Sequence, residues 1–161
     1  MKKLRTFLWF DNQAEEAARF YTSIFKDAKI GTVSRYGDAG PRPTGSVMTV
    51  DFELNGQAFV ALNGGPEFSF NPSISFVVDC ETQAEVDRYW DHLGEGGEHG
   101  QCGWLTDKFG LSWQVVPVVL YDLVSGPDPA SQRAMAAMLK MGKLEIEELR
   151  KAYEQGSRGS L

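Results

Sequence analysis

One residue that could take part in chemistry is a glutamine in the middle of an otherwise apolar strand. Residues 102–117 read CGWLTDKFGLSWQVVP, and Gln114 lies in the second of two runs rich in β-forming residues. A carboxylate at this place would suggest a metal ligand or a general base. A neutral amide can donate and accept hydrogen bonds without carrying charge. Gln114 therefore either orients a polar group of a ligand or ties two strands together, and both interpretations stay open.

Side chains that bind transition metals are few in this chain. The only histidines are His92 and His99, and the only cysteines are Cys80 and Cys102. A zinc or iron site needs about three converging side chains from His, Cys, Asp and Glu. His92 falls in a predicted helix and His99 in a glycine-rich turn, so we expect no bound metal and no cofactor. Two cysteines make no disulfide framework, which favours a cytoplasmic location.

A carboxylate pair occurs in the stretch VDFEL, residues 50–54. Asp51 and Glu53 alternate with apolar residues, so they are expected to share one face of a strand. We expect this to be the outer, solvated face, and we give the pair little weight for acid–base chemistry.

Length and charge limit the class of protein. The chain has 161 residues, 42% of them hydrophobic, and a net charge of −6. This composition predicts a single domain with one core. The basic residues are scattered, so we expect no nucleic-acid partner, and no apolar run is long enough to cross a membrane. The start, MKKLRTFLWFDNQAEE, is interpreted as a first strand and not as a signal peptide.

An internal repeat organises the chain. FDNQAEEAARFY, residues 10–21, and CETQAEVDRYW, residues 80–90, both follow a β-rich run and share Gln-Ala-Glu. The spacing of apolar residues in both copies predicts a helix. Each copy opens with a helix-capping signature, in the pairs Asn12 with Glu15 and Thr82 with Glu85.

The segments after each predicted helix are rich in β-forming residues. Asn55-Gly56 between two apolar runs predicts a hairpin, and Asp107 to Gly110 predicts a second turn. Beyond Pro117, Asp128-Pro129 and the stretch KLEIEELRKAY predict helices, followed by a frayed tail, EQGSRGSL. The pattern predicts an α+β fold with two βαβββ modules and C-terminal helices. Module one spans about 1–66, module two about 72–117 and the helical extension about 118–156, all within one domain.

This arrangement resembles the vicinal oxygen chelate superfamily of glyoxalase I, bleomycin-resistance proteins and extradiol dioxygenases. The chain is most similar to its PhnB-like branch, often labelled 3-demethylubiquinone-9 3-methyltransferase. The stretches that carry the resemblance are FLWFDNQAEEAARFYTSIF, LNGGPEFSFNPSISFVVDC, EVDRYWDHL, CGWLTDKFGLSWQVVP and AMLKMGKLEIEEL. The resemblance implies that each module curls into a half-barrel, that paired halves enclose a cup, and that the protein is a homodimer.

Metal-using members of the superfamily hold a cation with His and Glu side chains from the first and last strands of each half. The resemblance places these positions at Arg5, Ser73, Gln114 and either Val60 or Ala61. None of these is a strong ligand, and a protonated arginine has no lone pair to give. The residues expected to line a ligand cavity are Arg5, Phe7, Trp9, Asn63, Ser73, Ser75, Trp104 and Gln114.

Three functions are compatible with these residues. The first is a small-molecule-binding protein without a tightly held metal. The second is a metal-dependent lyase, isomerase or dioxygenase, and the third is a resistance protein that sequesters a toxic compound. Methyl transfer is the least supported, because no G-x-G-x-x-G turn of a typical methyl-donor site is present.

Overall fold

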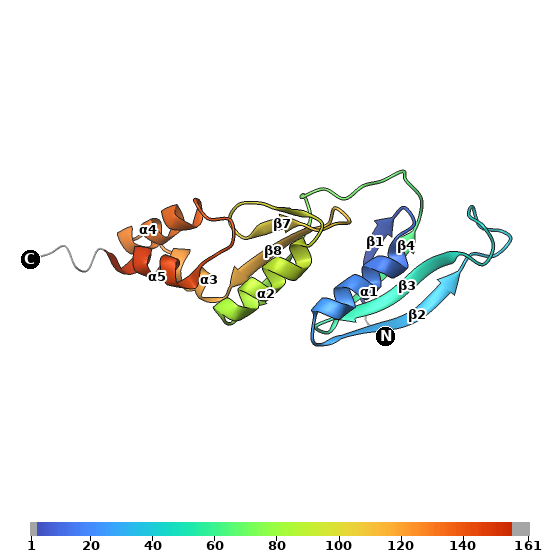
Figure 1. The fold of residues 1–161 in the computed structure, drawn as a ribbon, viewed down its shortest axis with the longest axis horizontal. Coiled ribbons are helices and arrows are strands. Elements are labelled where there is room, and N and C mark those ends of the chain that lie inside the picture. Colours follow the sequence, from blue (N-terminus) through green and yellow to red (C-terminus); the bar gives the residue numbers. More distant parts are fainter. Residues whose placement is uncertain (1–2, 156–161) are drawn as a thin grey trace, which may run out of the picture. The chain divides into compact units, whose positions relative to one another are not determined.

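The computed structural model describes residues 3–155, which divide after Phe70 into two compact units. The first unit is a four-stranded mixed sheet with one helix (Figure 1). Its elements are β1 (Thr6–Phe10), α1 (Ala14–Ile24), β2 (Ala28–Arg35), β3 (Val47–Leu54) and β4 (Gln57–Asn63). The strand order is β1-β4-β3-β2, with β1 parallel to β4 and the other pairs antiparallel. This is the βαβββ module that the sequence predicts.

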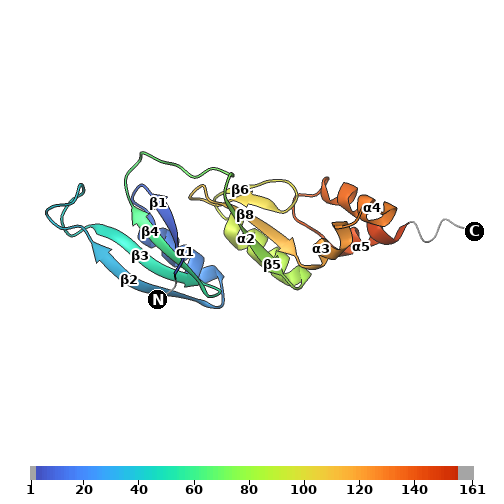
Figure 2. The ribbon, with the colours of Figure 1, turned by 180° about the vertical axis from the view of Figure 1, so that it is seen from behind.

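One face of this sheet packs against α1. The helix buries its apolar side, which consists of Ala14, Ala17, Ala18, Tyr21 and Ile24. The strand residues Val50, Phe52 and Leu54 are at most 4% exposed, and the Phe52 ring stacks on Phe59 at 5.1 Å. Within residues 3–70, no helix lies on the opposite face of this sheet, and Figure 2 gives the view from the other side. We call the face of each sheet that lies opposite its α1 or α2 helix the open face.

The hairpin between β3 and β4 fixes which residues reach the open face. Asn55 and Gly56 adopt left-handed φ angles of 49° and 80°, as expected for a two-residue turn. Glu53 consequently pairs with Ala58. Side chains alternate along a strand, so a one-residue slip would exchange the two faces.

The predicted capping pair of the first helix is wrong. Helix α1 begins at Ala14, and its N-cap residue, Gln13, makes no side-chain capping bond. The amide of Asn63 does this instead, because its Oδ1 accepts from Ala14 N at 2.8 Å while its Nδ2 donates to Val47 O at 3.1 Å. A partner from the end of β4 therefore replaces the local one.

The second unit repeats the module. Its elements are β5 (Ser75–Cys80), α2 (Gln83–Gly94), β6 (Glu98–His99), β7 (Trp104–Thr106) and β8 (Ser112–Pro117), in sheet order β5-β8-β7-β6. Here the predicted cap is confirmed. Thr82 accepts from Glu85 N at 3.2 Å, and the Glu85 carboxylate accepts from Glu81 N at 2.9 Å.

The turn between β7 and β8 is organised by a buried carboxylate. Asp107 is 2% exposed. It accepts from the backbone N–H groups of Phe109 and Leu111 and, at 2.9 Å, from the indole N–H of Trp113. The predicted turn is confirmed, whereas this role of Asp107 is not visible in the sequence pattern.

Three helices complete the second unit, α3 (Val119–Val124), α4 (Pro129–Met138) and α5 (Ile146–Glu154). Asp128 caps α4 as predicted. Their shared core consists of Val116, Leu120, Leu144 and Leu149. None of the helices between residues 3 and 155 combines the length and apolar composition that a bilayer crossing requires. Most of the predicted frayed tail, residues 156–161, lies outside the described residues.

The glutamine of the second Gln-Ala-Glu repeat joins α5 to α2. Gln83 Oε1 accepts from Ile146 N at 2.8 Å, and its Nε2 donates to Leu144 O and to Asp87 Oδ1. Lys143 Nζ lies 2.9 Å from the same Asp87 oxygen. These donors hold the pKa of the Asp87 carboxyl below its usual value.

We expect Gln83→Ala to lower the free energy of unfolding by about 1–2 kcal/mol, because it leaves the first turn of α5 without its side-chain acceptor. Gln13→Ala is the matched control from the first repeat and should change it by less than about 0.5 kcal/mol. Urea unfolding followed by Trp fluorescence measures both. Equal effects of the two substitutions would contradict the capping role.

Candidate functional site

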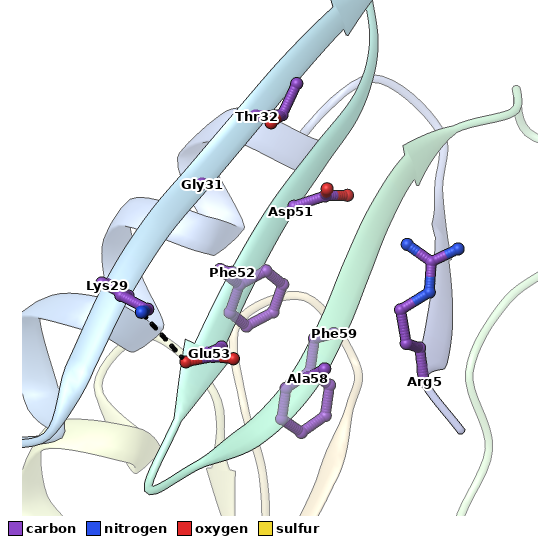
Figure 3. A pocket seen from close by; sticks show the side chains of 9 residues that line it. All are labelled: Arg5, Lys29, Gly31, Thr32, Asp51, Phe52, Glu53, Ala58 and Phe59. Carbon is purple, nitrogen blue, oxygen red and sulfur yellow. Dashed lines mark ion pairs between the residues drawn. The ribbon is translucent and has the colours of Figure 1, made fainter. Parts of the chain in front are cut away.

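An open depression of about 250 Å³ lies on the open face of the first unit (Figure 3). It sits where β1 and β4 begin and β3 ends. Its lining residues are Arg5, Lys29, Gly31, Thr32, Asp51, Phe52, Glu53, Ala58 and Phe59. All of them belong to the first unit.

The depression exists because two positions on β4 and β2, the strands that flank β3, carry little or no side chain. Ala58 of β4 lies beside Glu53 in the register of the sheet. Gly31 of β2 lies in an irregular segment of the β2–β3 pairing, and a Cβ built there would be 3.3 Å from the Asp51 Cβ. A larger residue at either position would fill the space above the strands.

Two carboxylates lie side by side in the floor. Asp51 and Glu53 alternate with buried apolar residues and share the face away from the core, as predicted. They point to the open face, because Asp51 shares a row with Val60 and Phe7. Glu53 Oε2 lies 3.5 Å from Lys29 Nζ.

The structure separates the candidate residues of the first unit. Arg5 lines the depression. Phe7 lies further along the same open face and is 56% exposed. Trp9 lies near the other end of β1, where its indole N–H donates to Gly65 O at 2.9 Å. Asn63 points to the α1 side and has both ends of its amide engaged.

Three candidates of the second unit share that unit's open face. Gln114 lies between Trp104 of β7 and Val77 of β5 in the register. Its Nε2 donates to the Ser75 hydroxyl at 2.9 Å. Ser73 lies apart from them in the turn before β5, where its backbone N–H donates to the Asn71 side chain.

The structure therefore supports the strand-tying interpretation of Gln114. Its amide N–H joins β8 to β5 through Ser75. The side-chain oxygen Oε1 of Gln114 makes no hydrogen bond within residues 3–155, so it is also open to a ligand.

The residues at the superfamily's metal positions do not fit a zinc or iron ion. On β4, Val60 reaches the open face, whereas Ala61 pairs with Leu8 and Val50 on the α1 side. Together with Arg5, Ser73 and Gln114, this set supplies only a hydroxyl and an amide as donors. Within residues 3–155, no group of three or more His, Cys, Asp and Glu side chains could hold a metal ion.

The histidines belong to other parts of the second unit. His92 is on the surface of α2. The His99 ring stacks on Trp90 at 4.4 Å, and its Nε2 lies 2.9 Å from Trp90 O. His99 therefore joins the short strand β6 to α2.

The sequence interpretation did not include Lys29, Asp51 and Glu53 among the residues expected to line a cavity, although they line the depression. A usable signal was present, because Asn55-Gly56 predicts the hairpin and the hairpin sets the row of each carboxylate. The face that carries Val50 and Phe52 had to meet the helix, which leaves the other face for the carboxylates.

Comparison with known proteins identifies the family. The family model for 3-demethylubiquinone-9 3-methyltransferase matches residues 2–116. The chain belongs to this family. The PhnB protein of Bacillus cereus is 38% identical with a TM-score of 0.66, over 73% of this chain and 100% of that one.

Two further structures share the fold at lower identity. PA1353 of Pseudomonas aeruginosa is 21% identical with a TM-score of 0.60, over 73% of this chain and 98% of that one. The fosfomycin resistance protein FosX of Mesorhizobium loti is 15% identical with a TM-score of 0.51, over 71% and 91%. The predicted PhnB-like, vicinal oxygen chelate assignment is confirmed. No functionally curated protein matches this chain.

The C-terminal helices lie beyond the matched region. The family match ends at residue 116, before α3 begins at Val119. The resemblance expected for the stretch AMLKMGKLEIEEL is therefore outside the family model.

The two cysteines differ in their surroundings. Cys80 is 0% exposed, and burial, followed by the nearby charges of Glu85 and Asp79, raises the pKa of its thiol to about 12. Cys102 is half-buried, and its Sγ lies 3.6 Å from Met138 O.

We expect Cys80 of the native protein to resist alkylation by iodoacetamide at pH 8, because the thiolate is the reactive species and this thiol stays protonated. Peptide mass mapping before and after unfolding in urea measures the modification. Cys80 should be alkylated only after unfolding, and rapid labelling of native Cys80 would contradict its burial.

Proposed function

We propose that this protein binds a small polar organic molecule in the depression on the open face of its first unit, without a tightly bound metal. One observation carries the proposal. Four charged side chains surround a hollow of about 250 Å³ whose floor is kept low by Gly31 and Ala58. Small-molecule sites are typically concave and place a few polar groups within apolar walls.

The second unit, taken by itself, carries a separate set of candidate ligand contacts in this proposal. Ser75, Trp104 and Gln114 present a hydroxyl, an aromatic ring and a free amide oxygen on that unit's open face. Phe7 and Trp9 are proposed as apolar contacts on the first unit, and Asn63 is left out because its amide is engaged with the start of α1.

Methyl transfer is disfavoured in this proposal. Nucleotide-like methyl donors bind where a parallel strand leads through a glycine-rich turn into a helix. Both sheets here are mixed and four-stranded, and their strand-to-helix connections contain no such turn. A metal-dependent lyase, isomerase or dioxygenase is disfavoured by the donor set at the superfamily's metal positions.

Substituting the small floor residue tests the site. Ala58→Trp should fill the depression and abolish the stabilisation that a bound compound gives, whereas Ala136→Trp on the exposed surface of α4 should leave it unchanged. Thermal-shift screening of a compound library finds ligands, since occupancy at a hundred times the dissociation constant stabilises by about 2.7 kcal/mol.

Mass spectrometry of the recovered compound separates turnover from sequestration, and both outcomes agree with the proposed binding. Equal binding to the Ala58→Trp variant would place the site elsewhere. One equivalent of transition metal, whose removal by chelator ends the ligand response, would overturn the metal-free part of the proposal.

We also propose that the protein is a cytoplasmic homodimer, as proteins of this fold commonly are. Each open face exposes apolar side chains, with Phe7 56% and Val77 46% exposed, and exposed apolar surface of this kind often marks a protein–protein interface.

Light scattering after gel filtration should give about twice the chain mass of 17.9 kDa. Phe7→Glu should weaken the dimer, and Leu139→Glu, at the exposed residue that follows α4, should not. A single-chain mass at micromolar concentration would contradict the dimer.

A further inference from the structure

Of the four charged side chains around the depression, two form an ion pair with each other and two do not. Lys29 and Glu53 occupy paired positions on β2 and β3, and their charged atoms lie 3.5 Å apart. They offset one another before any ligand arrives. The side chains of Arg5 and Asp51 have no ion pair or hydrogen bond within residues 3–155. A ligand can meet these two charges without breaking an internal interaction.

The two uncompensated charges lie on opposite sides of one strand. Asp51 belongs to β3 and Arg5 immediately precedes β1, with β4 between them. Figure 3 shows the Asp51 carboxyl and the Arg5 guanidinium on either side of β4, on the same face of the sheet. Neighbouring strands are about 4.8 Å apart, so the two backbones are separated by about 10 Å.

The strand between them leaves room for a ligand. Ala58 is the β4 residue beside Glu53, and the next pair in the register, Thr6 with Phe59, puts Arg5 on its other side. Asp51 lies one row further along, beside Val60, so the path from Asp51 to Arg5 crosses β4 diagonally between Val60 and Ala58. A short chain of methylene groups suits this path, because both β4 side chains are apolar.

From this juxtaposition we infer that the ligand of the proposed site is a small zwitterion, a molecule with an ammonium group at Asp51 and an acidic group at Arg5. The inference rests on the proposed function and adds the chemical class. A guanidinium binds a carboxylate or a similar oxyanion through two parallel hydrogen bonds. A carboxylate accepts hydrogen bonds from an ammonium group, and the ligand's own two charges leave the net charge of the site unchanged.

A matched series of four-carbon compounds tests the inference on the full-length protein. 4-Aminobutanoate carries both charges, butanoate only the negative one, butylamine only the positive one, and butanamide neither. Ligand-observed NMR titration should give 4-aminobutanoate a dissociation constant at least tenfold below those of the other three. Raising the salt concentration should reduce this difference between the dissociation constants, because salt screens exposed charges.

Two single-charge substitutions then assign the ends of the ligand. Arg5→Gln should weaken binding of 4-aminobutanoate at least fivefold and leave butylamine unchanged. Asp51→Asn should weaken 4-aminobutanoate similarly and leave butanoate unchanged. Lys26→Gln and Asp91→Asn change the net charge equally at exposed positions outside the depression, and both should bind as the native protein does.

The possible failures are distinguishable. If butanamide or the singly charged compounds bind as tightly as 4-aminobutanoate and Ala58→Trp blocks them, the site stands and the zwitterion inference is wrong. Unchanged zwitterion binding in both Arg5→Gln and Asp51→Asn also overturns it. If Ala58→Trp does not weaken the binding of any compound, charged or neutral, both the proposed function and the zwitterion inference are wrong.

Discussion

The register of the β3–β4 hairpin is the constraint on which the rest of the first unit depends. Helix α1 needs an apolar surface, and Phe52 with its neighbours on alternate positions supplies it. Because strand side chains alternate, this packing sends Asp51 and Glu53 to the open face. A slip by one residue would bury both carboxylates against α1, at a large desolvation cost. The charge of the depression is thus a consequence of how the core packs.

Neutral amides connect elements that are far apart in the chain. Asn63 joins β4 to the start of α1, Gln83 joins α2 to the start of α5, and Gln114 joins β8 to β5. An amide can donate and accept at once without the desolvation cost of a charge. Where a metal-using relative would place a glutamate, Gln114 therefore serves a structural contact and keeps an oxygen available.

The sequence predicted local features well and distant partners poorly. The Thr82 cap was predicted because its partner, Glu85, is three residues away and the geometry is local. The cap of α1 was missed because its acceptor, Asn63, comes from the far end of the module. The role of the Asp107 carboxylate was missed partly for the same reason, because one of its hydrogen-bond donors is the indole of Trp113 on the following strand.

The sequence by itself determined the two βαβββ modules, the hairpin at Asn55-Gly56 and the division of each strand into two faces. These follow from periodicity and turn chemistry, which act over a few residues. Only the tertiary structure decided that Arg5 lies across β4 from the β3 carboxylates, with Ala58 between Arg5 and Glu53. Parallel pairing of β1 with β4 brings together residues more than fifty positions apart, and no local rule specifies which rows will meet.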